Sequence, residues 1–357
     1  MSHFLQLHFL TAYAAANLNR DDTGRPKTVV FGGAERLRIS SQSLKRAFRT
    51  SDVFTNGLPG ALGTRSQRFA EALVAALVAR GVEDQEAIAR VAALVETEKL
   101  GKVKKGEVRT EQLVHLAPEE LEALNALADR LAVAALEDEK AVLVLKDKPR
   151  AADIAMFGRM LADNSRYNVE AAVQVAHAFT THRATVEDDY YTAVDDIKSD
   201  DLGSDRGAGF IGVQEFGAGL FYLYVCINAD LLLTNLAGDR ALAEDAIAAL
   251  IRAAATVSPR GKQNAFASRA KASYALLEIG TETPRSLSAA FQHPVGARPG
   301  EDDQFTASVA RLTQLKEGFA KAYGERLDSV VVNAHDADTA SLDQLIAAAR
   351  AIFDDKA

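Results

Sequence analysis

The side chains with the clearest capacity for chemistry are the cations of one short stretch, FGGAERLRISSQSLKRAFRTS (Phe31–Ser51). It holds five Lys or Arg residues and one acid, although the chain of 357 residues carries 41 basic and 49 acidic side chains and a formal net charge of −8. Gln42, Lys45, Arg46 and Arg49 recur at helical spacing and would share one face, with no acid at i±4 to neutralise it. Such a face predicts an anion-binding surface, and a solvated basic helix face is the alternative.

Other reactive residue types lack the spacing that metal or nucleotide chemistry needs. His177 and His182 are five apart and fall on different faces of a helix, and the single cysteine, Cys226, lies in the apolar run LFYLYVCIN. No GxxxxGK[ST] loop occurs, and GKQ (Gly261–Gln263) is only a short loop that could contact a phosphate. The sequence therefore predicts no metal site, no cofactor and no catalytic residue.

The elements that must position the basic stretch can be read from periodicity and turn residues. HFLQLHFL predicts an opening strand, and NLNRDDTGRPK a loop. TVVFGG and AERLRIS predict two strands around a Gly-Gly turn, with Leu37 on one face and Arg36 and Arg38 on the other. Ser40 or Ser41 is placed to cap the helix SQSLKRAFRTS.

The remainder alternates helical and mixed segments. RFAEALVAALVARG, EDQEAIARVAALVETEKL and PEELEALNALADRLAVAALEDE predict three amphipathic helices. LFYLYVCINADLLL and RAKASYALLEIG predict strands, GDRALAEDAIAALIRAAATV and SLDQLIAAARAIFDD helices, and the polar segment from about Arg183 a projecting hairpin or functional loop. This order suits an α+β fold with a ferredoxin-like core. With no apolar run near the ~18 residues that span a bilayer and no disulfide framework, we expect a cytoplasmic protein without a membrane partner.

Several short sequence motifs resemble those of a known protein family. NRDD, KTVVFGG, RLRISSQSLKRAFR, DIAMFGRM, HAFTTH, YYTAVDD, GVQEFGAGLFY and GKQNAF occur in this order over most of the chain. They resemble the CasC family, the guide-RNA-binding backbone subunits of type I-E CRISPR Cascade surveillance complexes. The resemblance implies an RNA-recognition-motif-like palm (1–57, 151–182 and 221–357, with a C-terminal helix), a helical finger domain (58–150) and a thumb hairpin (183–220).

The resemblance also implies roles for individual residues. The guide backbone would be bound by Arg20, Lys27, Arg38, Ser40, Ser41, Gln42, Lys45, Arg46 and Arg49. Met160 would pack beside the guide, its alternative being a core methionine, and the thumb would wedge Tyr190, Tyr191, Thr192 and Val194 between bases, its alternative being partial burial of the tyrosines. Lys102, Lys104, Lys105, Lys146 and Lys148 are candidates for target-DNA contact, with a solvated charge run as the other interpretation.

The partners implied are CRISPR RNA, target DNA through the guide, further copies of the chain head to tail, and subunits of the CasA, CasB, CasD and CasE families. Base pairing would carry specificity, so backbone clamps and stacking suffice for the protein. Asp21 and Asp22 leave a second hypothesis, a ribonuclease using a loop aspartate on the same fold, as in related type III subunits. A third is a filament protein that binds no RNA. The unneutralised helix face favours the non-catalytic RNA scaffold.

Overall fold

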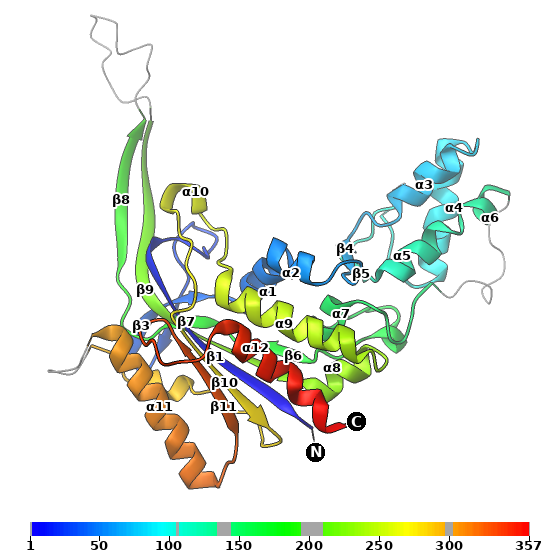
Figure 1. Ribbon diagram of the computed structural model, residues 1–357. Helices are drawn as coiled ribbons and strands as arrows, with labels where there is room; N and C mark the ends of the chain where they lie inside the picture. Colours follow the sequence, from blue (N-terminus) through cyan, green and yellow to red (C-terminus); the bar gives the residue numbers. More distant parts are fainter. Residues whose placement is uncertain (1, 105–106, 134–143, 194–209, 297–302, 357) are drawn as a thin grey trace, which may run out of the picture.

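The computed structural model describes residues 2–104, 107–133, 144–193, 210–296 and 303–356, and its centre is an antiparallel sheet (Figure 1). Its strands are β1 Phe4–Ala16, β2 Thr28–Phe31, β3 Ala34–Ile39, β6 Val173–Val175, β7 Ala178–Thr180, β8 Val186–Ala193, β9 Phe210–Asn228, β10 Tyr274–Gly280 and β11 Asp328–Asn333. Their order is β11-β10-β1-β9-β7-β3-β2, with β6 and β8 also paired to β9. The mixed α+β class is thus confirmed, with a large antiparallel sheet.

The predicted opening strand, β1, forms and is buried on both faces. Leu7 pairs with Val225 of β9 and Leu277 of β10, and its side chain lies in the larger sheet core. Leu10 packs in the core on the opposite face. Gln6 and His8 are buried as well. The alternation of apolar and polar residues in this strand therefore does not mark one buried and one solvent-exposed face, because both faces are covered.

Helices cover the two faces of the sheet unequally (Figure 1). One face carries α1 Ser41–Arg49, α2 Asp52–Gly57, α7 Ala152–Phe157, α8 Ala229–Asn235, α9 Arg240–Thr256 and α12 Leu342–Arg350, which is followed by the 3₁₀ segment η4 Ala351–Lys356. The other carries α11 Gln304–Tyr323 and η3 Ser288–Phe291. The short α10 Gln263–Phe266 lies beyond the end of α9. No helix in the described ranges is long and apolar enough to cross a membrane.

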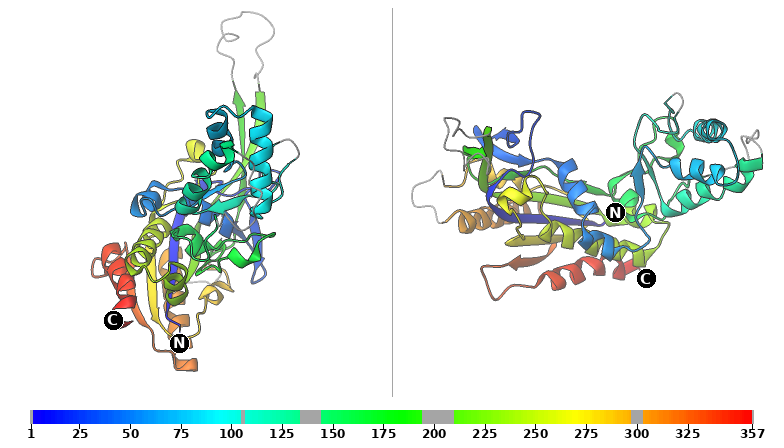
Figure 2. Two further views of the ribbon diagram at one scale, coloured as in Figure 1. Left: turned by 90° about the vertical axis from the view of Figure 1, so that its right-hand side faces the viewer. Right: turned by 90° about the horizontal axis from the view of Figure 1, so that it is seen from above.

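A helical part lies apart from the sheet, as Figure 1 and the view from above in Figure 2 show. It contains α3 Glu71–Val78, α4 Asp84–Thr97, α5 Pro118–Asn125, α6 Ala128–Val133, the two-stranded sheet of β4 Thr64–Ser66 and β5 Val114–Leu116, and the 3₁₀ turn η1 Ser165–Tyr167. It has a hydrophobic core of its own, to which Leu161 and Tyr167 also belong. The chain therefore buries apolar surface in separate places.

Two predicted elements were wrong in extent. The single helix expected over PEELEALNALADRLAVAALEDE is interrupted between α5 and α6, although Leu124, Leu127 and Leu131 still enter the core of the helical part together; residues 134–143 lie outside the described ranges. The strand expected over LFYLYVCINADLLL ends at Asn228, whose side chain accepts a hydrogen bond from the Leu231 backbone N–H (3.0 Å) and begins α8.

The Gly-Gly turn between β2 and β3 was predicted correctly and has a second purpose. Gly32 and Gly33 have φ of 60° and 73°, the left-handed region that glycine adopts without strain. A Cβ on Gly32 would lie 1.5 Å from the Gln292 carbonyl oxygen, so the turn also allows close backbone approach. The hairpin is thereby held against the segment that follows η3, and β3 delivers the chain to α1.

Candidate nucleic-acid interface

Helix α1 presents the predicted cations opposite a buried stripe. Ser40 is the N-cap, and its hydroxyl accepts a hydrogen bond from the Ser43 N–H (3.4 Å), while Leu44 and Phe48 are buried. We call Gln42, Lys45, Arg46 and Arg49, on the remaining side, the α1 face.

The α1 face is not uniform in exposure. Arg46 and Gln42 are exposed, whereas Lys45 is half-buried and its ammonium lies 5.9 Å from the Phe157 ring centroid. This is within the distance at which an aromatic face attracts a cation. Burial lowers the pKa of Lys45, because desolvation disfavours the charged form. An anion bound beside Lys45 would offset that desolvation.

Arg49 is committed to a buried acid. Its Nε donates to Asp153 Oδ2 (2.6 Å), and its Nη2 donates to the Gly63 carbonyl (3.4 Å). Asp153 is fully buried, and only 21% of the Arg49 side chain is exposed. The expectation that no acid neutralises this face was therefore wrong for Arg49, because the acid comes from α7, far away in sequence.

The loop before β2 is tied to the start of α1. Asn19 accepts a hydrogen bond from Ser40 N through its side chain (2.9 Å) and from Lys27 N through its carbonyl (2.8 Å). Arg20 is exposed at the edge of this loop. These hydrogen bonds bring the loop that carries Arg20 and Lys27 toward the helix N-terminus.

The aspartates of this loop have local partners. Asp21 Oδ1 accepts hydrogen bonds from Thr23 N (2.9 Å), Thr23 Oγ1 (2.8 Å) and Arg25 N (3.0 Å). The Thr23 hydroxyl in particular lowers the pKa of Asp21. Asp21 therefore shapes the turn, and Asp22 beside it is exposed. Among the residues with described positions, no group of three His, Cys, Asp or Glu side chains could hold a metal ion.

The two arginines of β3 differ in burial. Arg38 Nη1 lies 2.8 Å from His177 Nδ1, and desolvation, together with the charges of Arg38 and Lys27, lowers the pKa of His177. The neutral imidazole can therefore accept this hydrogen bond. Arg36, expected on the same surface, is instead fully buried and donates to the carbonyls of Thr180 and Phe291 (2.9 Å each), because the face of β3 opposite Leu37 is covered as well.

Serine hydroxyls near α1 are already engaged. The Ser40 hydroxyl caps the helix, and the Ser41 hydroxyl donates to the Val175 carbonyl (2.7 Å). What remains for an anion at this end is the partial positive charge of the helix and its first backbone N–H groups.

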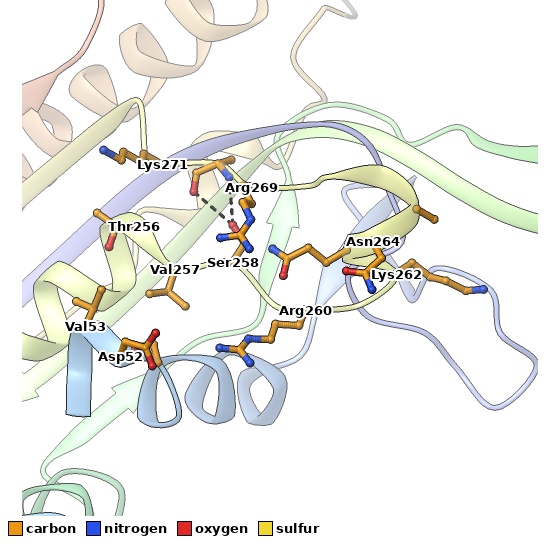
Figure 3. A pocket seen from close by; sticks show the side chains of 14 residues that line it. Asp52, Val53, Thr256, Val257, Ser258, Arg260, Lys262, Asn264, Arg269 and Lys271 are labelled. Atoms are coloured by element: carbon orange, nitrogen blue, oxygen red, sulfur yellow. Dashed lines mark hydrogen bonds between the residues drawn. The ribbon is translucent and has the colours of Figure 1, made fainter. Parts of the chain in front are cut away.

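A basic cleft of about 980 Å³ opens just after α1 (Figure 3). Its walls are the start of α2 (from Ser51), the end of α9 and the loop 258–271. The cations that line it are Arg260, Lys262, Arg269 and Lys271, against one acid, Asp52. As a possible phosphate contact, the sequence indicated only Gly261–Gln263 in this loop. The absence of any acid between Ser258 and Leu277 was the signal that could have found the rest.

The cleft loop has an unusual backbone. Lys262 and Ala267 have φ of 51° and 48°, conformations that residues with a Cβ rarely adopt. A Cβ on Gly261 would lie 2.4 Å from the Leu18 carbonyl oxygen, so the loop packs directly against the end of β1. The loop is thereby fixed beside the Arg20–Lys27 loop.

Met160 is a surface residue and not a core methionine. Its side chain is 81% exposed and lines a small cavity of about 220 Å³ together with Leu113, Lys99 and Lys102. The structure thus brings Met160 beside Lys102, two residues for which the resemblance implied different ligands. Of the other candidate lysines, Lys104, Lys146 and Lys148 are exposed, and Lys105 lies outside the described residues.

The predicted hairpin tyrosines lie on paired strands. Tyr190 pairs with Val213 and Tyr191 with Gly212 along β8 and β9, next to Thr192. Tyr190 is 62% exposed, so burial under a neighbouring element does not explain it. Tyr191 packs over Gly212, where a Cβ would lie 2.6 Å from the tyrosine ring. Val194 lies outside the described residues.

Fold and surface together define an α+β protein with a large antiparallel sheet and cations gathered around one helix and one loop. The profile of the family described as CT1975-like protein matches residues 5–356, and the chain belongs to that family. It is a CasC-like backbone subunit of CRISPR surveillance complexes, as the short strings indicated.

Two solved structures illustrate the similarity. A chain of a "CRISPR RNA-guided surveillance complex, pre-nicking" is 30% identical with a TM-score of 0.79, over 97% of this chain and all of that one. A chain of a "CRISPR RNA-guided surveillance complex" is 27% identical with a TM-score of 0.61, over 97% and 99% of the two chains. No curated protein matches.

Proposed function

We propose that this chain is a non-catalytic CRISPR RNA-binding subunit that polymerises head to tail along the guide and presents it to target DNA in antiviral defence. The observation that carries the proposal is the α1 face together with the basic cleft that opens beside it. Similarity to chains of RNA-guided surveillance complexes supports it. Type I-E Cascade, with CasA, CasB, CasD and CasE partners, is the assembly that the sequence strings favour.

The guide backbone would follow the cations. Lys45, Arg46 and Gln42 would contact phosphates and 2′-hydroxyls, the N-terminal N–H groups after Ser40 and Ser41 would receive another phosphate, and Arg20, Lys27 and Arg38 would extend the surface. The cleft cations Arg260, Lys262, Arg269 and Lys271 would continue it beyond α1. Because all of these contacts address the backbone, a guide of any sequence could bind.

The remaining candidates would act on bases and on target DNA. Exposed Tyr190, with Tyr191, Thr192 and Val194 of the thumb, would stack on or wedge between bases, a mode that tolerates every sequence. Met160 would pack beside the guide, and Lys102, Lys104, Lys105, Lys146 and Lys148 would approach target DNA. In this proposal the sheet is a ferredoxin-like palm, residues 58–150 the finger domain and 183–220 the thumb.

The direct test is nucleic-acid content after co-expression with a CRISPR array and the companion subunits. The chain has no Trp and eight Tyr, so bound RNA would dominate absorbance at 260 nm. We expect Lys45→Ala/Arg46→Ala to lose a large RNase-protected RNA signal. Lys316→Ala/Lys321→Ala is the matched control, because α11 lies on the opposite face of the sheet and the same charge is removed. If both variants retain the same ratio of absorbance at 260 nm to absorbance at 280 nm, the RNA does not bind along the α1 face.

Polymerisation and catalysis need their own measurements. Native mass spectrometry with guides of increasing length should show the number of copies rising stepwise with RNA length; a constant number would refute head-to-tail assembly. Purified protein should leave bound RNA at full length. RNA that is shortened by wild type and preserved by Asp22→Ala would instead support the ribonuclease.

A further inference from the structure

Arg49 differs from the other cations of the α1 face in what surrounds it. Lys45 and Arg46 have no carboxylate partner in the part of the chain that the structure describes. Arg49, by contrast, ends a chain of polar contacts that runs beneath α1 into the helical part. Its role therefore has to be derived from that chain and not from its place on the helix surface.

The first member of the chain is Asp153, a carboxylate with no exposed surface. Besides Arg49, it accepts hydrogen bonds from the Gly63 N–H (2.7 Å) and from His115 Nε2 (3.0 Å). Burial alone would raise the pKa of Asp153, but the hydrogen bonds from His115, Gly63 and Arg49 lower it overall. The carboxylate is thus held ionised in the interior, which requires donors that stay in place.

The second member is a buried ion pair one step further into the helical part. Arg159 Nη1 donates to Glu120 Oε2 (2.7 Å) and to the His115 carbonyl (3.4 Å), and neither charged side chain is more than 1% exposed. Arg159 Nη2 also donates to the Lys146 carbonyl (3.0 Å), and Glu120 Oε1 accepts from Lys146 N (2.8 Å). His115 therefore connects the two clusters.

These contacts lie where the chain crosses between the sheet and the helical part. Gly63 precedes β4, where the chain enters the helical part, and Lys146 lies on the way out. A Cβ on Gly63 would lie 2.7 Å from His115 Nε2, so the crossing is closely packed. The residue after Arg159 is Met160, which projects into solvent. The series of polar contacts thus has Arg49 at one end and, at the other, Arg159, the residue that precedes Met160.

We infer that Arg49 is a positioning residue and not a phosphate-binding one: through Asp153 and His115 it fixes the helical part, and with it Met160, relative to Lys45 and Arg46. This inference rests on the proposed function, because the distance between Met160 and the cations Lys45 and Arg46 matters only if both contact the same bound RNA. It differs from the role that the resemblance implied for Arg49. The guanidinium would hold α1 and the helical part in the spacing that the RNA backbone bridges.

Salt dependence separates the two roles. The logarithm of the binding constant for single-stranded RNA falls with the logarithm of salt concentration, with a slope of roughly −0.7 per phosphate neutralised. For the full-length chain and a mixed-sequence RNA, Lys45→Gln should reduce the slope by about 0.7. The charge-neutral pair of changes Arg49→Gln/Asp153→Asn should keep the wild-type slope. It should nevertheless weaken binding about 2- to 30-fold at every salt concentration, as expected for a lost coupling.

The two possible failures are distinguishable. If wild type shows no salt-dependent RNA binding, the proposed function fails. If wild type binds steeply but the Arg49→Gln/Asp153→Asn variant loses slope as Lys45→Gln does, Arg49 contacts a phosphate and only the inference is overturned.

A second arm needs no RNA. Amide hydrogen exchange of Arg49→Gln should be faster than wild type in β4 and β5, which flank the Asp153 cluster, while Lys45→Gln leaves these amides unchanged. Unchanged exchange in Arg49→Gln would show that Arg49 does not hold the crossing, and would overturn the inference independently.

Discussion

Two buried carboxylates in this protein have the same kinds of partner but different positions. Asp153 accepts hydrogen bonds from Arg49 and His115. Glu278 accepts them from Arg285 (Nη2 to Oε1, 2.9 Å) and from His8 (3.1 Å). Each is an ionised acid held by one guanidinium and one imidazole, with almost no exposed surface.

The difference lies in what each cluster joins. Glu278 and His8 are diagonal neighbours on the paired strands β10 and β1, where Glu278 pairs with Gln6, and Arg285 lies in the segment that follows β10, so the cluster belongs to the sheet. Asp153 joins α1, α7 and β5, elements of parts with separate cores. The same chemistry thus stabilises a fold in one place and, we infer, sets a distance in the other. A buried ionic cluster does not reveal its role by its chemistry alone.

The largest effect should come from Glu278→Gln. It removes a buried carboxylate and leaves the half-buried Arg285 with Glu325 as its carboxylate partner, and removing one partner of a buried pair typically costs about 3–5 kcal/mol. Denaturant unfolding measures this as a lower midpoint, and the salt slope of RNA binding should not change. Glu244→Gln is the control, because its ion pair with Arg240 lies at the surface. A loss no larger than that control would remove the distinction between a buried and a surface pair.

Acid should affect the Glu278 cluster in two stages. Burial alone would raise the pKa of Glu278, but Arg285 and His8 lower it to about 2, and desolvation lowers the pKa of His8 below 6.5. A lowered pKa in the folded state means that the unfolded chain binds more protons. The free energy of unfolding should therefore decline below pH 6.5 for His8, and further from pH 4.5 toward about 2 for Glu278. Unfolding curves across this range should show it, and a decline unchanged in Glu278→Gln would contradict the assignment.

Asp153→Asn should have an intermediate effect on stability. The carboxamide oxygen can still accept from Gly63, but its NH₂ meets the donors of Arg49, so we expect a cost of about 1–3 kcal/mol. Unlike Glu278→Gln, it should also weaken RNA binding. If RNA affinity scales with stability in the same way for both variants, the functional contrast between the two clusters disappears.

The smallest effect on stability is expected for Lys45→Gln/Arg46→Gln. Neither side chain supports a buried network, and surface substitutions of this kind usually change stability by less than about 0.5 kcal/mol. RNA binding should nevertheless fall, and the salt slope should decrease by about 0.7 for each phosphate contact removed. A large loss of stability would mean that the Lys45 contact with Phe157 matters to folding more than its half-buried position suggests.

Local elements near the site were predictable because short-range physics decides them. The Gly32–Gly33 turn follows from the left-handed conformation that it needs, and α1 follows from a Ser cap and apolar residues at helical spacing. The class of the fold and the position of Lys45 and Arg46 on one face followed from the same patterns. In each case the residues that decide the local structure lie within a few positions of it in the sequence.

The errors at Arg49 and Arg36 involve partners far away in sequence. The sequence around Arg49 does not predict its ion pair with Asp153. The sequence around Arg36 does not predict that β3 is covered on both faces. The basic cleft likewise needs α2 and the loop 258–271 to meet.

By itself, the sequence determined which residues carry charge, that a helix begins at Ser40 or Ser41, and which family the chain belongs to. Only the tertiary structure decided which of those charges remain free to meet an anion. Hydrogen-bond periodicity and capping act over a few residues, whereas a guanidinium is neutralised by whichever carboxylate the packing places within about 3 Å, however distant in the chain.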